Sequence, residues 1–241
     1  LNLSFWENPS RINNEIKNYL INIKDGNVLA NREDLEIYKP QRPKDLGMSG
    51  SLTRKFLNGM CSVPGTSYLE AGLASGSTFC AATAKNIIPQ NQFVGVEAWN
   101  PSHFRSGNKM KKLFFNNFKK YVDQEIDQCD NVEIIQENIF NLNFFKIFKD
   151  KNLRPVNFYF YDADHSENAT WWGLTTVYNI LSNNFIYVVD DWNDYSVRQG
   201  AFKAIKSLGL SVHGYYQMLG LAGPDLLKPT GEKVHSEIDP D

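Results

Sequence analysis

The chain has 241 residues, 42% of them hydrophobic and 22% charged, a composition typical of a folded globular protein. A chain of this length can bury one substantial core, so we expect one main domain with some decoration. The formal net charge of −2 argues against general binding to nucleic acid or to a membrane surface, because a balanced surface attracts neither.

Cysteine usage and apolar runs add further exclusions. The chain has three cysteines and no CxxC pair, so neither a disulfide framework nor a zinc knuckle is expected. Free thiols are typical of reducing surroundings, and we therefore expect a cytoplasmic protein. No apolar run reaches the roughly 20 residues that span a bilayer, and the N-terminus lacks a signal-peptide pattern.

The first part of the chain, residues 1–64, is expected to form a helical segment with a lid. Ile12, Ile16, Tyr19 and Leu20 recur at helical spacing and predict an amphipathic helix that ends near residues 25–26. Residues 38–47 place two prolines among charged residues and predict an extended loop. A second helix is predicted over residues 51–60, and residues 39–53 are the candidate lid.

From Thr66 onward, short apolar strands alternate with helices. The predicted strands are 67–70, 93–97, 132–136, 156–161, 185–189 and 212–218, and the predicted helices lie near 78–87, 108–122, 142–149, 167–182 and 195–208. This alternation favours an α/β fold over residues 65–222. We expect a Rossmann-like three-layer sandwich, with a mainly parallel seven-stranded sheet and helices on both faces. Residues 223–241 are the predicted C-terminal tail.

Ligands of such folds gather at the carboxyl ends of the strands, so the residues after each strand are informative. A glycine turn follows the first strand. Gly72 and Gly76 allow a tight turn and a close approach to a ligand, where a Cβ atom would intrude. Glu70, just before the turn, can hold an ammonium group. The turn lacks the GxGxxG spacing of a dinucleotide site and is a weak signal by itself.

The second predicted strand ends in another acid, Glu97, about 20 residues beyond the turn. At that distance in a nucleotide-binding βαβ unit, a carboxylate accepts hydrogen bonds from ribose hydroxyls. Trp99 is placed to stack on an adenine ring. Asn138 and Ile139, after the third strand, are a polar-then-apolar edge suited to the same ring.

Residues 68–85 together with Glu97 resemble motifs I and II of the class I S-adenosylmethionine-dependent methyltransferases, and the resemblance extends over roughly residues 65–218. It implies that the acid–glycine turn holds the methionine moiety of S-adenosylmethionine and that the later acid binds the ribose. The chain departs from the family where Ala74 replaces a common middle glycine. The candidate cofactor-binding residues are Glu70, Gly72, Ala74, Ser75, Gly76, Glu97, Ala98, Trp99, Asn138, Ile139 and Asp162.

Two further predicted strands end in acids. Residues 156–161 lead into Asp162 and Asp164, and residues 185–189 lead into Asp190 and Asp191. Like charges this close need a cation, a shared proton or water between them. Oxygen ligands suit a hard divalent ion such as Mg²⁺. The alternative is that Asp164 and Asp191 cap helices or form turns, as aspartates often do.

These segments resemble the metal-dependent O-methyltransferases of the caffeoyl-CoA type and, more closely, of the macrocin type. The resemblance implies Asp162, Asp190 and Asp191 as metal ligands and His165 as the general base, with Asp162 as part of the catalytic group. An imidazole can take a hydroxyl proton at neutral pH, which agrees with that role. The alternative for His165 is a capping residue of the next helix.

The sequence therefore predicts a methyltransferase, metal-assisted and acting on a hydroxyl of a small molecule such as a sugar or a catechol-like ring. Trp192 is a candidate wall of the acceptor pocket, and Arg42, Arg54 and Lys55 are candidates for an anionic acceptor. Rival interpretations are a metal-independent methyltransferase and a non-catalytic binding or scaffold domain. An NAD-dependent oxidoreductase is disfavoured by the missing GxGxxG. The acceptor and the oligomeric state, homo-oligomer included, stay open.

Overall fold

The computed structural model describes residues 5–25, 49, 51–100, 107–122 and 126–217. Two helices, α1 (Pro9–Asp25) and α3 (Ser51–Cys61), precede the sheet, as their helical periodicity predicts. The predicted loop at 38–47 and most of the candidate lid lie outside the described residues, as do Arg42 and the predicted tail. None of the described helices is long and apolar enough to cross a membrane.

Parallel strands form the centre of the molecule. They are β1 (Ser67–Ala71), β2 (Gln92–Val96), β3 (Val132–Ile135), β4 (Val156–Tyr161) and β5 (Leu181–Val189). Their order is β3-β2-β1-β4-β5, and every neighbouring pair is parallel. In the register, Leu69 of β1 faces Val94 on one side and Tyr159 on the other. The order reverses between β1 and β4, which is where ligands of such sheets bind.

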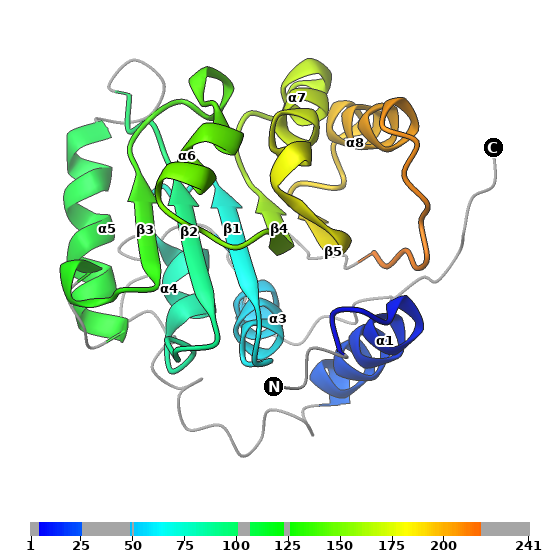
Figure 1. Ribbon diagram of the computed structural model, residues 1–241, viewed down its shortest axis with the longest axis horizontal. Helices are drawn as coiled ribbons and strands as arrows, with labels where there is room; N and C mark the ends of the chain where they lie inside the picture. Colours follow the sequence, from blue (N-terminus) through cyan, green and yellow to red (C-terminus); the bar gives the residue numbers. More distant parts are fainter. Residues whose placement is uncertain (1–4, 26–48, 50, 101–106, 123–125, 218–241) are drawn as a thin grey trace.

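Helices alternate with the strands along the chain and cover both faces of the sheet (Figure 1). They are α4 (Ser77–Thr83), α5 (Gly107–Val122), α6 (Phe144–Asp150), α7 (Glu167–Val177) and α8 (Tyr195–Ser207). Short 3-10 turns occur at Ile126–Gln128, Ile139–Asn141 and Tyr178–Ile180. The predicted three-layer α/β sandwich is therefore confirmed.

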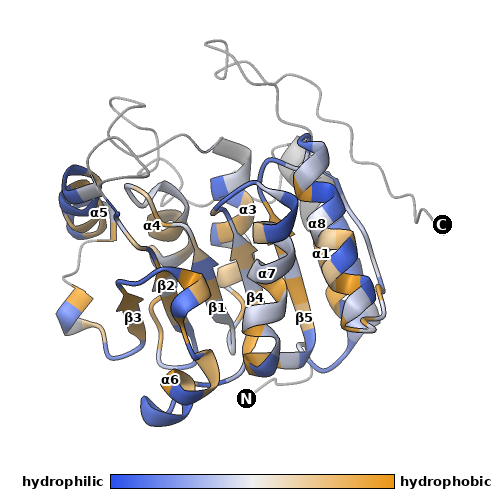
Figure 2. Ribbon diagram, turned by 90° about the horizontal axis from the view of Figure 1, so that it is seen from above, coloured by the Kyte–Doolittle hydropathy of each residue, from blue (hydrophilic) through white to orange (hydrophobic). Residues whose placement is uncertain are grey.

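Two hydrophobic clusters, one on each face of the sheet, form the core. Successive strand residues point to opposite faces, so Tyr68 and Phe158 pack with α1, α3, α4 and α5, whereas Leu69 and Tyr159 pack with α6, α7 and α8. Figure 2 shows the same arrangement from above, with α4 and α5 on one side of the strands and α6 and α7 on the other. Because both faces of the sheet are covered, the strand sequences are nearly continuous runs of apolar residues.

The strand count differs from the prediction. The described residues form five strands rather than seven. The predicted strand at 212–218 is wrong over its described part, which holds one isolated bridge residue, Gln217. Side-chain contacts with α1 hold this segment instead, because Asn13 donates to the backbone oxygen of His213 and the hydroxyl of Tyr216 donates to Asn13.

The helices of the predicted N-terminal segment share their core with the sheet. Ile12 of α1 and Phe56 of α3 belong to the same buried cluster as Tyr68 of β1. The division of the chain at residues 64/65 and 222/223 stays a prediction, and in packing terms α1 and α3 belong to one face of the sandwich.

Candidate functional site

The candidate site lies at the carboxyl ends of β1, β2, β4 and β5, where the loops carry acidic and small residues. The turn after β1 is held against the end of β4. Gly72 has a φ of 95°, and a Cβ atom on it would lie 1.8 Å from the backbone oxygen of Asp162. Gly76 has a φ of 91°, and its Cβ would lie 2.7 Å from the Phe114 ring. Both glycines thus allow close approach between parts of this chain itself, and only residues without a side chain fit there.

Glu70 lies at the start of this turn and is completely buried. The hydroxyls of Tyr68 and Thr78 each donate to one of its carboxylate oxygens at 2.5 Å. Burial raises the pKa of Glu70 to about 8, with the negative charges of Asp190 and Glu97 adding to the shift and the two hydroxyls opposing it. A carboxylate in this state gains stability from a nearby cation.

Glu97, just past β2, connects the turn after β1 with the loop after β2 through hydrogen bonds. One of its oxygens accepts the backbone N–H of Ala74 at 3.0 Å, and the other accepts that of Trp99 at 2.9 Å. The indole N–H of Trp99 donates back to the Ala74 oxygen at 2.8 Å, and its ring packs on Phe114. Ala74, Trp99 and Asp191 all have positive φ, a costly conformation that the surrounding contacts maintain.

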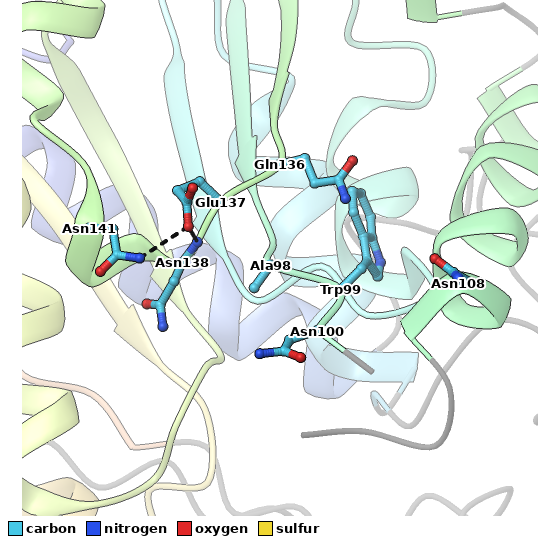
Figure 3. Close-up of a pocket in the computed structure, with 8 residues that line it drawn as sticks. All are labelled: Ala98, Trp99, Asn100, Asn108, Gln136, Glu137, Asn138 and Asn141. Atoms are coloured by element: carbon cyan, nitrogen blue, oxygen red, sulfur yellow. Dashed lines mark hydrogen bonds between the residues drawn. The ribbon is translucent and has the colours of Figure 1, made fainter. Parts of the chain in front are cut away.

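A pocket of about 390 Å³ opens beside this loop, between the ends of β2 and β3 (Figure 3). Of the predicted adenine-site residues, Ala98, Trp99 and Asn138 line it, whereas Ile139 is 6% exposed and packs in the core. The rest of the lining consists of Asn100, Asn108, Gln136, Glu137 and Asn141. Asn138 also accepts the N–H of Phe140, which begins the 3-10 turn Ile139–Asn141.

The acids after β4 and β5 converge, as their positions on neighbouring strands predict. Ligand atoms of Asp162, His165 and Asp191 lie within 4.8 Å of one another, and no other such group occurs among the residues that the structure describes. Nε2 of His165 is 3.1 Å from Oδ2 of Asp191, and both side chains are about half exposed. Burial raises the pKa of Asp162 well above its usual range, and neighbouring carboxylates, Asp190 first among them, add to the shift.

Asp190 lies outside that three-residue group, yet its charge helps to raise the pKa of Asp162. Its backbone N–H donates to the Tyr161 oxygen, which continues the β4–β5 pairing by one residue. Burial raises the pKa of Asp190, the charge of Asp191 adds to the shift, and His165 opposes it.

The alternative interpretation of the aspartates holds for Asp164. Its carboxylate accepts the N–H of Ser166, and Ser166 is the residue that caps α7. His165 is therefore beside the cap without being the cap. Asp191 also begins a turn, since its backbone oxygen accepts the N–H of Asp194, but its carboxylate faces His165.

Several residues near the site were not predicted. Thr78 and Tyr68 hold Glu70, and Asn117 of α5 donates to the backbone oxygen of Ser75. The spacing of Glu70 and Thr78 across a glycine turn is a usable signal for the first contact. Nothing in the local sequence marks Asn108 or Asn117, because only the packing of α5 against the turn brings them there.

Trp192, the predicted wall of an acceptor pocket, follows the acidic pair and folds back against α8. Its indole N–H donates to the hydroxyl of Tyr215 at 2.7 Å, and its ring packs on Phe202. Arg198 holds its backbone oxygen. These contacts fix the indole at the end of β5.

No protein-family model matches the sequence, and no curated protein matches it significantly. Solved structures do match. An O-methyltransferase from Bacillus cereus, in complex with S-adenosylhomocysteine, is 14% identical with a TM-score of 0.55, over 91% of this chain and 96% of that one. TomG, an O-methyltransferase from Streptomyces achromogenes involved in tomaymycin synthesis, in complex with S-adenosylmethionine, is 14% identical with a TM-score of 0.52, over 84% and 86%.

The chain has a methyltransferase fold. At this identity the likeness establishes the arrangement of strands and helices, and the chemistry must be argued from the residues. The methyltransferase fold places the turn after β1 and the acids after β2, β4 and β5 at one edge of the sheet.

Proposed function

We propose that the chain is an S-adenosylmethionine-dependent methyltransferase, assisted by a divalent metal ion and acting on a hydroxyl group of a small molecule. The observation that carries the proposal is the pair of acids Glu70 and Glu97, joined through the turn at Ala74 on a methyltransferase fold. Glu70 suits the ligand's ammonium group, and Glu97 suits the ribose hydroxyls, since each carboxylate oxygen can accept a further hydrogen bond.

The residues present fit this cofactor in charge and in polarity. The negative charges of neighbouring acids raise the pKa of Glu70 and of Asp162, and a sulfonium and an ammonium group would offset this repulsion. The hydroxyl of Ser75 is buried and has no hydrogen-bond partner among the described residues. A buried polar group without a partner is costly, and a bound polar ligand can supply one. The amide-rich pocket beside Trp99 offers donors and acceptors to a purine edge.

The donor set at β4 and β5 fits a hard divalent ion. The carboxylates of Asp162, Asp190 and Asp191 would hold it, since Mg²⁺ prefers oxygen ligands. A bound divalent ion supplies positive charge that makes an acceptor hydroxyl more acidic. His165 stays the base in this proposal, because a nitrogen ligand is a poorer match for Mg²⁺ than the three carboxylates nearby.

The contact between His165 and Asp191 explains how the imidazole would act. If Nε2–H donates to Asp191, Nδ1 is the unprotonated nitrogen and takes the hydroxyl proton of the acceptor. The carboxylate of Asp191 then stabilises the imidazolium that results. S-adenosylmethionine supplies an electrophilic methyl group when bound, and the overall products are the methyl ether, S-adenosylhomocysteine and a proton. Holding the acceptor beside the methyl group supplies much of the acceleration.

Two properties of the surroundings complete the proposal. Vicinal hydroxyls, as on a sugar or a catechol-like ring, suit two-point contact with a metal-assisted site, and Trp192 would form one wall. The cysteines Cys61, Cys80 and Cys129 are buried thiols that form no disulfide with one another, in keeping with a cytoplasmic protein.

Calorimetric titration with S-adenosylhomocysteine tests the cofactor. We expect binding by the wild type and a loss of about tenfold or more in affinity for Glu97→Ala, the usual range for a hydrogen bond to a charged group. Glu133→Ala is the matched control, because Glu133 pairs with Lys151 away from these loops. Absence of binding by the wild type would leave a scaffold domain as the better interpretation.

Chelation tests the metal. Methyl transfer to a panel of catechols and sugars should stop in EDTA and return with added Mg²⁺. Asp191→Asn should weaken Mg²⁺ binding about tenfold or more while S-adenosylhomocysteine still binds. Full activity in EDTA would assign the chain to the metal-independent methyltransferases instead.

A further inference from the structure

Asp191, in the loop after β5, has an uncommon backbone conformation. Its φ is 49°, a left-handed value that costs free energy for a residue with a side chain and persists only where neighbouring contacts enforce it. Its backbone oxygen accepts the N–H of Asp194 at 2.8 Å, and its carboxylate is 3.1 Å from Nε2 of His165. The backbone of Asp191 sets the directions of its own side chain and of the next residue, so contacts that fix Trp192 also constrain Asp191.

Trp192 is held at three points. Its backbone oxygen accepts from Nη1 of Arg198 at 2.7 Å, and its ring packs on the Phe202 ring with 5.5 Å between the centroids. Its indole N–H donates to the hydroxyl of Tyr215 at 2.7 Å. The first two contacts come from α8, which begins just after the loop, whereas Tyr215 reaches the indole from 23 positions away.

The segment that carries Tyr215 is itself anchored to α1. Nδ2 of Asn13 donates to the backbone oxygen of His213 at 3.2 Å, and the hydroxyl of Tyr216 donates to the backbone oxygen of Asn13 at 3.2 Å. Gly214 lies so near that a Cβ atom on it would be 2.1 Å from Oδ1 of Asn13. One residue of α1 thus holds the chain on both sides of Tyr215, and it fixes the backbone from which the Tyr215 hydroxyl meets the indole.

We propose that Tyr215 is a positioning residue: by holding the indole of Trp192, its hydroxyl keeps Asp191 in the conformation that sets the carboxylate against His165, and it thereby supports the affinity of the site for a divalent ion. This inference rests on the proposed function, which assigns Asp191 to the metal. A segment remote from the acids in the sequence, anchored on α1, takes part in metal binding through this contact.

Calorimetric titration of Mg²⁺ into protein saturated with S-adenosylhomocysteine tests this role. Tyr215→Phe removes only the hydroxyl, and it should weaken Mg²⁺ binding about twofold to tenfold, the usual range for one hydrogen bond. The affinity for S-adenosylhomocysteine should not change, because Glu97 follows β2, and β1 and β4 separate β2 from β5.

Tyr159→Phe is the matched control. The hydroxyl of Tyr159 donates to the Gly173 oxygen inside the core, so its removal should lower the free energy of unfolding without changing the Mg²⁺ affinity. A loss of Mg²⁺ affinity in this control equal to that of Tyr215→Phe would overturn the proposal, because general destabilisation would then explain both.

A double-mutant cycle tests whether Tyr215 acts through Trp192. Trp192→Phe removes the donor of the same hydrogen bond and keeps an aromatic ring beside Phe202, so it should also weaken Mg²⁺ binding. Once the indole is gone, Tyr215→Phe should cause no further loss, and the double variant should match Trp192→Phe alone. Losses that multiply would overturn the proposal, and so would an unchanged Mg²⁺ affinity in Tyr215→Phe.

The remaining outcomes separate this inference from the function on which it rests. If Tyr215→Phe fails to fold, Trp192→Phe decides: weaker Mg²⁺ binding supports the proposal, and unchanged binding overturns it. Wild-type protein that binds S-adenosylhomocysteine but no Mg²⁺ would overturn the role of Tyr215 together with the metal, while the cofactor assignment would stand. Binding of neither ligand would overturn the proposed function as a whole.

Discussion

Glu70 is a buried carboxylate whose protonation state depends on its surroundings. Its only described hydrogen-bond partners are the hydroxyls of Tyr68 and Thr78, and neither carries a charge. Burial raises its pKa to about 8, so without a ligand it holds a proton at neutral pH. Burying such a group costs stability. In the proposed function, a cationic ligand would return it to the ionised state.

The pH dependence of stability follows from this residue. The unfolded chain releases the Glu70 proton near pH 4.5 and the folded chain releases it near pH 8, so folding is progressively destabilised as pH rises through this window. Glu70→Gln removes the penalty. Its free energy of unfolding relative to wild type should rise between pH 5 and pH 8, by an amount on the order of a few kcal/mol.

Urea denaturation at each pH measures the difference, with Glu7→Gln as the control at an exposed glutamate. The same change there should leave the difference between variant and wild type flat with pH. A flat profile for Glu70→Gln as well would contradict the protonated state of Glu70.

His165 gives a second prediction at this scale. His165→Ala should lower turnover by about a hundredfold or more, the usual contribution of a general base, while S-adenosylhomocysteine and Mg²⁺ still bind. Activity assays and calorimetry on the same variant check both parts. Loss of Mg²⁺ affinity together with turnover would make His165 a metal ligand alongside Asp162 and Asp191.

At the scale of elements, the turn after β1 depends on β4. Gly72 sits against the backbone of Asp162, so the shape of the turn and the place of a proposed metal ligand depend on the same contact. From the sequence, these glycines are expected to make room for a ligand. The structure shows that the neighbouring strand already requires them.

Gly72→Ala should therefore destabilise the fold by about 2 kcal/mol or more beyond the cost of a left-handed alanine, because its Cβ would overlap the Asp162 oxygen. Gly209→Ala is the matched control. Gly209 also has a positive φ, of 63°, but nothing lies within 4 Å of its Cβ position. The control should cost only about 1 kcal/mol in urea denaturation. Equal losses for the two variants would show that β4 does not constrain the turn.

At the scale of the whole molecule, the parallel sheet concentrates acids from separate parts of the chain at one edge. Glu70, Glu97, Asp162, Asp190 and Asp191 come from four strand ends that span residues 70–191. The mutual repulsion of these groups lowers the cost of binding cations there. Cationic ligands would offset the repulsion among these acids, so ligand binding and protonation of the acids are linked.

Binding of S-adenosylmethionine should consequently release protons at pH 7, since its positive charge favours the ionised form of Glu70. Its affinity should increase as pH rises toward 8, where that proton is already lost. Calorimetry in buffers of different ionisation enthalpy measures the proton count. A heat of binding that is independent of the buffer would contradict the linkage.

Much of the fold follows from local sequence patterns. The alternation of apolar strands with helices predicts β1 to β4 to within one residue at each end, because burial on both faces leaves a continuous apolar run. The helices α4 and α7 end at Thr83 and Val177, four and five residues before the predicted ends. The start of β5 also differs. Its first residues, Leu181 to Asn184, are mostly polar, and pairing of Leu181 with Val156 brings them into the strand. The segment at 212–217 shows the opposite error, because a strand is predicted where the structure has an irregular segment hydrogen-bonded to Asn13 of α1.

The sequence by itself determined the kinds of groups at the strand ends: a glycine turn after an acid, a second acid, a paired acid and a histidine. Residue types and spacing carry that information, because strand ends are recognisable from hydropathy alone. Only the tertiary structure decided which groups meet. The pairing of β1 with β4 sets Gly72 against Asp162, and the Ser49 hydroxyl meets the hydroxyl of Ser77, 28 positions further along the chain. Local patterns encode neither contact.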